Sequence, residues 1–322
     1  MSKASPDNAN TLNNSLSENG IITDLARLLS SRHWAKGLKL FSRQAARNML
    51  LGNVRSRFRG RGMEFEEVRR YQAGDDIRTI DWKVSARAQG TFTKLFCEER
   101  ERPCHIIVDQ RSPLFFGSTG LFKSVLAAEV AAAVAWAALK GGDRVGGQVI
   151  GDYDERDSRA KHSKQSVLRF IHDISELNHA LLNATQDATK TTSTLANSLE
   201  ECKRITRPGT AIFIISDFHD FDANAAKALR NLAKNTDISL FKISDPLEQN
   251  LPVFGGIAIS DGQQSSMVYV NKNIKQHYQN SVDEKDALLK NIAIQARALF
   301  AELSTESDAQ KSLINLFTHS RK

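Results

Sequence analysis

Short apolar runs alternate with helical windows through the middle of the chain, and this alternation constrains the fold more than any other feature. In the windows, apolar residues recur every three or four positions, which predicts helices; the short β-branched runs predict buried strands. Strands separated by helices predict right-handed crossovers and a parallel sheet covered on both faces. The sequence therefore predicts an open, doubly wound α/β domain. The predicted strands are 104–109, 144–152, 210–217 and 237–245, and the predicted helices are 119–141, 166–182, 195–205 and 223–235.

Segments of different character flank this predicted domain. After residue 248 an alternating apolar pattern predicts a hairpin that turns at Asp261 and Gly262, and a helical period then runs from about 274 to 303. Ser118 or Thr119 is expected to cap the first long helix. The predicted organisation is a disordered tail (1–24), a basic helical and loop segment (25–62), a polar motif segment (63–103), the α/β domain (104–248) and a C-terminal hairpin with helices (249–322).

Membrane insertion, export and metal-thiol chemistry find little support in the sequence. The most apolar stretch, 125–139, is too short for a span and contains Glu129. The polar first twenty residues lack the basic and apolar regions of a secretory signal, so we expect a cytoplasmic protein. Cys97, Cys104 and Cys202 show neither zinc-site nor disulfide spacing and are predicted to be inert thiols.

Positive charge is concentrated near the N-terminus. The chain has a formal net charge of +7. Residues 27–62 contain ten basic residues and no acid, so the rest of the chain has a net charge of 7 − 10 = −3. Three explanations stay open: a solvated basic face, a protein-binding arm, or contact with nucleic acid or an anionic membrane surface. Phe58 is the only aromatic residue among the clustered arginines, so the pattern is a weak match to nucleic-acid binding.

Each predicted strand of the α/β domain ends with an acid: Asp109, Asp152, Asp217 and Asp245. Ligands of open parallel sheets bind beyond the carboxyl ends of the strands, where carboxylates could hold a hard divalent cation. The same acids could equally cap the helices that follow, where N-terminal amides and the helix dipole favour them. A nearby acidic run, 151–157, lacks the pattern of a calcium loop and is predicted to be a solvated loop. Four histidines are predicted to lie on the surface: His162, His172, His179 and His219.

Parts of the sequence resemble two known groups of proteins. The runs CHIIVDQRSPLFFGS, VGGQVIGD and AIFIISDF resemble the von Willebrand factor A type of α/β fold. The segment EFEEVRRYQAGDDIRTIDWKVSARAQGTFTKLFCEE strongly resembles the signature of the bacterial "domain of unknown function 58" family, and SDPLEQNLP and LSTESDAQKSLINLF resemble its ending. The similarity covers roughly residues 50–322.

The von Willebrand resemblance implies a metal-ion-dependent adhesion site with a DxSxS motif, and this chain departs from it. Asp109 matches the Asp and Asp217 matches a later Asp, but Arg111 and Pro113 stand where the two serines belong, beside Ser112. Proline offers no side-chain oxygen, and a guanidinium places a fixed positive charge near the metal position. We predict a degenerate site without cofactor or magnesium, in which Arg111 neutralises Asp109 or Asp217.

The motif segment contains a charged block around Trp82. One interpretation is a recognition or docking surface. The other is an ion-pair network that fixes the segment onto the α/β domain, with Trp82 as a buried anchor. The candidate interaction residues are Arg70, Tyr71, Gly74, Asp75, Asp76, Arg78, Asp81, Trp82 and Arg87.

Common enzyme motifs are absent from the sequence. The stretch 117–124 lacks the glycine that a phosphate loop needs before its lysine, and there is neither a GxSxG elbow nor an HExxH helix. We expect a non-enzymatic interaction or adaptor protein. The family resemblance implies a MoxR-type AAA+ ATPase as partner, in chaperone-like assembly or a stress response. The alternatives are a metal-dependent ligand binder using a modified adhesion site, and a binder of nucleic acid or anionic lipid through the basic segment.

Overall fold

The computed structural model describes two compact units of the chain. Residues 47–101 form the smaller unit, and residues 1–46 together with 102–322 form the larger one. The described residues are 20–38, 40, 63–72, 74–88, 90–98, 102–118, 120–183, 193–249, 251, 255–260 and 265–319.

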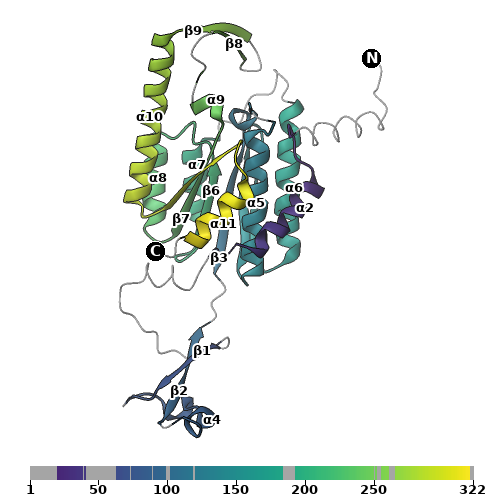
Figure 1. The fold of residues 1–322 in the computed structure, drawn as a ribbon. Coiled ribbons are helices and arrows are strands. Elements are labelled where there is room, and N and C mark those ends of the chain that lie inside the picture. The colour runs from purple at the N-terminus through teal and green to yellow at the C-terminus, as the bar shows by residue number, and fades with distance from the viewer. Residues whose placement is uncertain are drawn as a thin grey trace, which may run out of the picture. The chain divides into compact units, whose positions relative to one another are not determined.

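A six-stranded sheet with the order β10-β7-β6-β3-β4-β5 forms the centre of the larger unit (Figure 1). All neighbouring strands are parallel except β4 and β5. The α/β class and the mostly parallel sheet are thus confirmed. The order reverses at β3, which places a topological switch point between the carboxyl ends of β3 and β6. The strands are β3 (Pro103–Gln110), β4 (Arg144–Gly151), β5 (Glu155–Lys161), β6 (Ala211–Ser216), β7 (Asp237–Ser244) and β10 (Leu299–Ser304).

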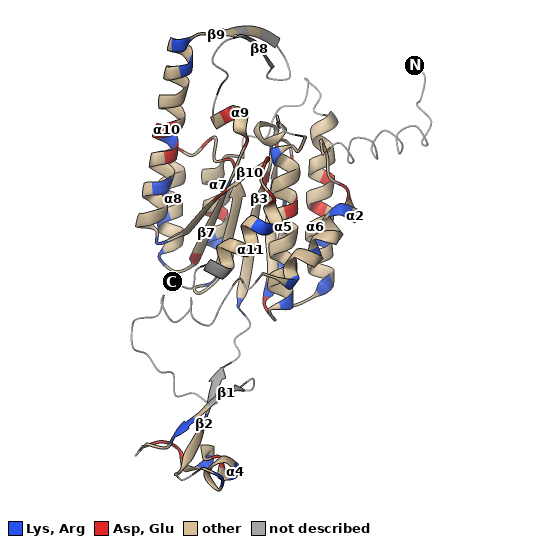
Figure 2. Cartoon of the chain, in the orientation of Figure 1, with Lys and Arg blue, Asp and Glu red and all other residues tan. Residues whose placement is uncertain are grey.

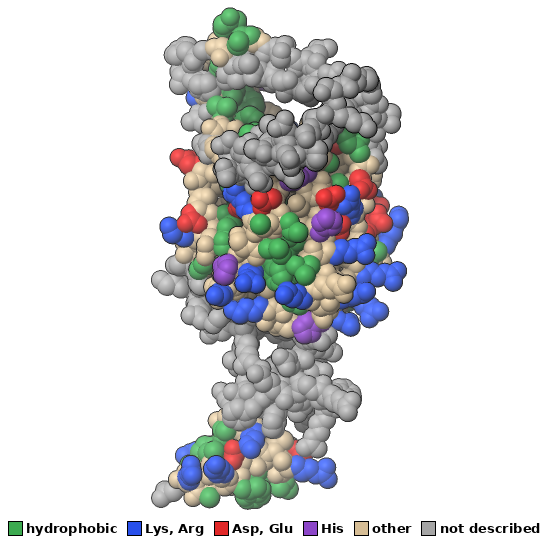
Figure 3. All heavy atoms as spheres, turned by 90° about the vertical axis from the view of Figure 1, so that its right-hand side faces the viewer, with side chains coloured by type: hydrophobic (Ala, Val, Ile, Leu, Met, Phe, Trp, Pro, Cys, Tyr) green, Lys and Arg blue, Asp and Glu red, His purple; other side chains and the backbone are tan. Residues whose placement is uncertain are grey.

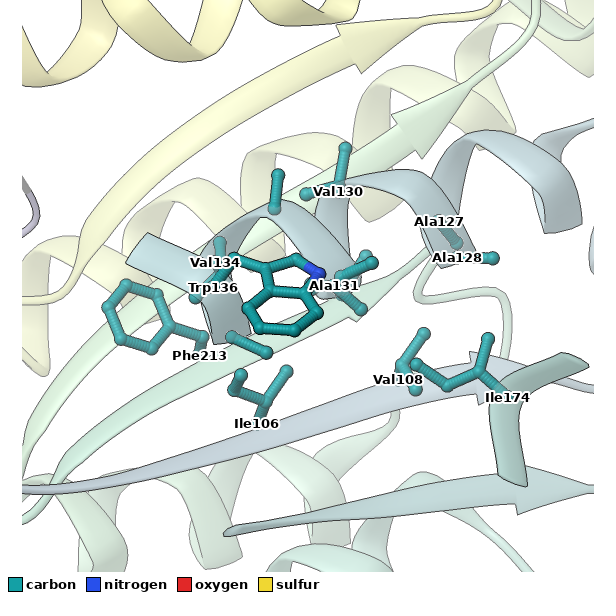
Figure 4. Close-up of a cluster of buried hydrophobic side chains, with 14 of the residues drawn as sticks. Ile106, Val108, Ala127, Ala128, Val130, Ala131, Val134, Trp136, Ile174 and Phe213 are labelled. Carbon is teal, nitrogen blue, oxygen red and sulfur yellow. The ribbon is translucent and has the colours of Figure 1, made fainter. Parts of the chain in front are cut away.

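Helices cover both faces of this sheet. Side chains alternate along β3, so Ile106 and Val108 join one core cluster while Ile107 joins the other. The first cluster includes Trp136 of the alanine-rich helix α5, whose small side chains allow close packing on the sheet (Figure 4). That face carries α2 (Leu25–Ser30), α5 (Lys123–Lys140), α6 (Lys164–Ala180) and α11 (Ala309–His319). The other carries α7 (Leu195–Ile205), α8 (Ala223–Ala233) and α10 (Lys272–Gln295).

Packed residues of the larger unit lie closer to the N-terminus than the sequence predicted. Ile22 and Thr23, placed by the sequence in a disordered tail, are fully buried. Gly20 adopts φ +73°, and a Cβ there would lie 2.3 Å from the carbonyl oxygen of Gly120, so only glycine fits this approach. The helix expected at the start of the basic segment is present as α2 and the 3₁₀-helix η1 (Ser31–Lys36). Residues 41–62, most of the basic segment, lie outside the described residues.

The helix predicted over 274–303 is shorter in the structure, and a strand follows it. Helix α10 ends at Gln295, and β10 then pairs with β7 as a parallel edge strand. Arg297 adopts φ +51°, which breaks the helix, and Leu303 is buried beside the sheet. The expected hairpin is present as β8 (Gly255–Ser260) and β9 (Ser265–Val270), preceded by α9 (Pro246–Gln249); its predicted turn lies outside the described residues.

Two further expectations near the sheet are wrong. The acidic run 151–157 was predicted as a solvated loop, but its last three residues begin β5. Strand β5 pairs antiparallel with β4 and forms the sheet edge opposite β10. Helix α5 begins at Lys123 without a side-chain cap. Of the two expected capping residues, Ser118 instead binds Asp245, and Thr119 lies outside the described residues.

The smaller unit is built on an antiparallel pair, β1 (Met63–Arg70) and β2 (Phe92–Glu98). Two short helical turns, η2 (Ile77–Thr79) and α4 (Trp82–Ser85), lie between these strands in the sequence. Ile80 forms an isolated bridge to Thr93, which attaches the connection to β2. Among the described helices of both units, none combines the length and the apolar character needed to cross a membrane.

Candidate functional site at the carboxyl edge of the sheet

The strand-end acids lie at the carboxyl edge of the sheet, as the pattern predicts. Asp109 belongs to the end of β3, and Asp152, Asp217 and Asp245 directly follow β4, β6 and β7. Asp109 and Asp245 are fully buried. Because a buried carboxylate needs compensation for its lost hydration, its partners determine what the site can do.

Asp109 accepts hydrogen bonds from several donors. The Arg111 side chain binds both of its oxygens, Nε to Oδ1 at 2.9 Å and Nη2 to Oδ2 at 2.7 Å. The Arg111 backbone N–H adds a bond of 3.1 Å to Oδ1, and the Ser216 hydroxyl donates to Oδ2 at 2.7 Å. These donors approach both oxygens, so little acceptor capacity remains for a metal or a substrate proton.

Arg111 joins Asp109 to a second acid. Its Nη1 and Nη2 donate to the two Asp220 oxygens at 2.7 and 3.1 Å, and Nη1 also donates to the Ser193 carbonyl. The predicted neutralisation of Asp109 by Arg111 is confirmed, whereas Asp217 is not its partner. Burial alone would lower the pKa of Arg111, but the hydrogen bonds and charges of Asp109 and Asp220 raise it, so the guanidinium is permanently charged.

A second buried cation, Lys123, neutralises Asp217. Lys123 is 1% exposed, and its Nζ lies 2.9 Å from Asp217 Oδ2 and 2.6 Å from Glu248 Oε1. Burial would lower the pKa of Lys123, but Asp217 and Glu248 raise it. Sequence analysis missed this residue. The available signal was a single lysine at the start of an otherwise apolar helix, a position that requires nearby acids if it is buried.

His219 also belongs to this edge, and it is exposed there, as the sequence predicted. Its Nδ1 lies 2.9 Å from Asp217 Oδ1. Burial lowers the pKa of His219, but the Asp217 carboxylate raises it above the ordinary value. A small cavity of about 140 Å³ opens beside this group, lined among others by Lys123, Glu248 and Tyr278.

The donor set does not fit a divalent cation as it stands. Asp109, Asp217 and His219 each offer a ligand atom, and these atoms lie within 4.8 Å of one another. However, the Arg111 guanidinium and the Lys123 ammonium already bind the two carboxylates. A metal would have to displace or tolerate both positive charges at contact distance.

The other two strand-end acids hold loops, and Asp245 also accepts from the Leu247 N–H at the start of α9, the helix-capping role that the sequence left open. Asp152 accepts from the backbone N–H of Ser112 at 3.1 Å and from its hydroxyl at 3.2 Å. Asp245 accepts from the Ser118 hydroxyl at 2.5 Å and from Thr305 at 2.7 Å. Ser112, a residue of the degenerate motif, therefore orients a loop rather than contacting Asp109. Acidic positions near α9 and the strand ends are visible in Figure 2.

In the smaller unit, the acids of the charged block stabilise local turns. Asp75 binds Arg69 at 2.6 Å and the Gln72 N–H at 2.9 Å. Asp76 accepts from the Arg78 N–H at 3.0 Å. Asp81 caps α4, and the Val84 and Lys83 N–H groups together with Lys94 lower its pKa despite desolvation.

The remaining candidate interaction residues support or surround these turns. Tyr71 donates its hydroxyl to the Asp75 carbonyl, and Gly74 adopts φ +105°. Arg70, Arg78 and Arg87 are exposed. Trp82 is 68% exposed, so it is not buried within the smaller unit. The cause is local: Asp81 fixes the start of a single helical turn, and the Trp82 side chain is left facing solvent.

Comparison with known proteins identifies a family. The model of the family described as "Protein of unknown function DUF58" matches residues 67–287. Two similar curated proteins are uncharacterized protein Rv1480 of Mycobacterium tuberculosis and uncharacterized protein Mb1516 of Mycobacterium bovis. Each is 27% identical over 226 residues, which cover 70% of this chain and 69% of the relative.

Solved structures show a distant likeness. A BatB protein from Bacteroides thetaiotaomicron aligns with a TM-score of 0.44 and 14% identity, over 68% of this chain and 98% of that one. A von Willebrand factor type A protein from Catenulispora acidiphila aligns with a TM-score of 0.40 and 14% identity, over 72% of this chain and 44% of that one. Values this low carry no information on function.

Proposed function

The chain belongs to the DUF58 family of proteins of unknown function, and from this premise we propose that it is a non-enzymatic adaptor for a MoxR-type AAA+ ATPase. The adaptor would serve in chaperone-like assembly or in a stress response. The choice of partner follows the family resemblance in the motif segment.

One observation carries the non-enzymatic part of the proposal. At the switch point, where open α/β sheets bind their ligands, Asp109 and Asp217 are each bound by a buried side-chain cation. General acid–base or metal chemistry needs carboxylates with free acceptor capacity or a shared proton. Here the charges neutralise one another, which favours a rigid binding surface over a reactive site.

A binding assay between purified partners tests the proposal. The full chain is immobilised and offered the host's MoxR-type ATPase without nucleotide, with ADP and with a non-hydrolysable ATP analogue. We expect capture in at least one nucleotide state and a change in the ATPase rate when the chain is added. An unrelated AAA+ ATPase offered to the same immobilised chain is the control. Absence of capture in every nucleotide state contradicts the partner, and equal capture of the unrelated ATPase contradicts its specificity.

A further inference from the structure

We propose that the smaller unit carries a docking surface for an acidic protein segment, with Trp82 as its apolar anchor and Arg78, Lys83 and Arg87 around it. This surface is called the Trp82 surface below. The inference rests on the proposed function, because it names the surface that holds a protein partner and the chemistry which that partner presents.

The acids of the block leave the Trp82 surface positively charged. Asp75 and Asp81 each bind a basic side chain and backbone N–H groups, and Asp76 holds the Arg78 N–H. Their carboxylates are therefore engaged in forming turns. A partner approaching the block encounters mainly the cations that these turns display.

Four basic side chains project from the block without an internal acid. Arg70, Arg78, Lys83 and Arg87 are exposed. Within the part of the chain that the structure describes, none of them forms an ion pair, whereas Arg69 and Lys94 do. Their charge is available to complement carboxylates on another molecule. The described atoms of the smaller unit in Figure 3 show basic and hydrophobic side chains with little acid.

Exposed apolar area accompanies this charge. Trp82 is 68% exposed and Ile77 is 65% exposed, both within the same short connection between β1 and β2. Tryptophan and arginine are the residues most enriched among those that dominate binding energy at protein interfaces. A segment that exposes a large ring together with guanidinium groups therefore fits a partner that offers an apolar pocket bordered by Glu or Asp.

The composition of the Trp82 surface favours protein over nucleic acid. Single-stranded nucleic acids are held by several aromatic platforms along a uniformly basic groove. Among the described residues of the smaller unit, Trp82 is the one strongly exposed aromatic side chain.

The test uses the full chain and fluorescent probes of defined charge. The probes are a short peptide rich in Glu, Asp and Leu, the same peptide with Lys at the acidic positions, and a single-stranded oligonucleotide. The variants are W82A and the double variant R78E/R87E. Matched controls come from the end of α7, where Ile205 is 51% exposed and Lys203 and Arg204 are exposed: I205A and K203E/R204E.

We expect the wild type to prefer the acidic peptide. W82A and R78E/R87E should bind this peptide at least about tenfold more weakly, and the α7 variants should bind it as the wild type does. Equal binding of the two peptides, stronger binding of the oligonucleotide, or equal losses in the α7 variants would overturn the inference. The ATPase assay separates the two proposals. Peptide binding that depends on Trp82 without ATPase capture contradicts the proposed partner alone, whereas ATPase capture unaffected by W82A overturns the docking surface alone.

Discussion

Asp and Arg residues are abundant both at the carboxyl edge of the sheet and in the charged block of the smaller unit, yet the two regions use them differently. At the edge, Asp109 and Asp217 are paired with the buried side chains of Arg111 and Lys123. In the block, Asp81 caps a helical turn while Arg78 remains exposed. A buried charge must find an opposite charge or several hydrogen-bond donors because it has lost its water, whereas an exposed one need not. Similar residue types thus become structural in one region and available for recognition in the other.

The largest expected effect comes from removing a buried cation. Arg111→Ser leaves Asp109 and Asp220 without their shared partner and should lower the free energy of unfolding by about 3–5 kcal/mol. Arg78→Ser in the charged block should change it by less than about 0.5 kcal/mol. Urea denaturation followed by circular dichroism measures both. Similar losses for the two variants would remove the distinction between the regions.

Lys123→Met should lower the free energy of unfolding by about 3 kcal/mol, somewhat less than Arg111→Ser. The loss is smaller because Glu248, one of the two partners of Lys123, has a side chain that is 35% exposed and regains water. Asp217 remains buried and loses its cation. Lys83→Met in the charged block is the matched control and should be nearly neutral, because that side chain is exposed. If Lys123→Met were as stable as the control, the ammonium would not be needed to neutralise Asp217.

Local pattern predicted most of the fold, and what it missed depends on long-range contacts. The runs at 104–109 and 210–217 contain the uninterrupted apolar stretches 106–108 and 211–215, so β3 and β6 were recognisable as buried strands. Strand β10 was taken for helix because it follows α10 closely. Its role is to pair with β7, 55 or more residues earlier in the chain, and periodicity carries no information on such pairing.

The candidate site divides in the same way. Asp109 and Arg111 are two positions apart, so their pairing was visible in the sequence. The contact between Lys123 and Asp217 spans 94 residues and arises only when α5 packs beside β6. The exposure of Trp82 was also unpredictable, because burial of a large ring depends on whether another element covers it.

A smaller effect is expected from pH. The Asp217 carboxylate raises the pKa of His219 above its ordinary value of 6.5, although burial opposes the rise. The protonated histidine therefore stabilises the native state fully below pH 6.5, and this contribution is lost as pH rises through the raised pKa. Thermal denaturation between pH 6 and 8 should show falling stability for the wild type and a flatter profile for His219→Gln. Parallel profiles would mean that the imidazole and Asp217 are not coupled.

The smallest effect is predicted for metal removal. Because Arg111 and Lys123 already neutralise the carboxylates, the melting temperature of the wild type should be the same in EDTA and in excess Mg²⁺. Arg111→Ser removes the guanidinium and supplies a hydroxyl beside Asp109, Asp217 and His219, whose ligand atoms lie within 4.8 Å of one another. Mg²⁺ at ten times its Kd should then stabilise this variant by about 1.4 kcal/mol. Stabilisation of the wild type that disappears in Asp109→Ala would instead show that a metal, and not Arg111, completes the edge of the sheet.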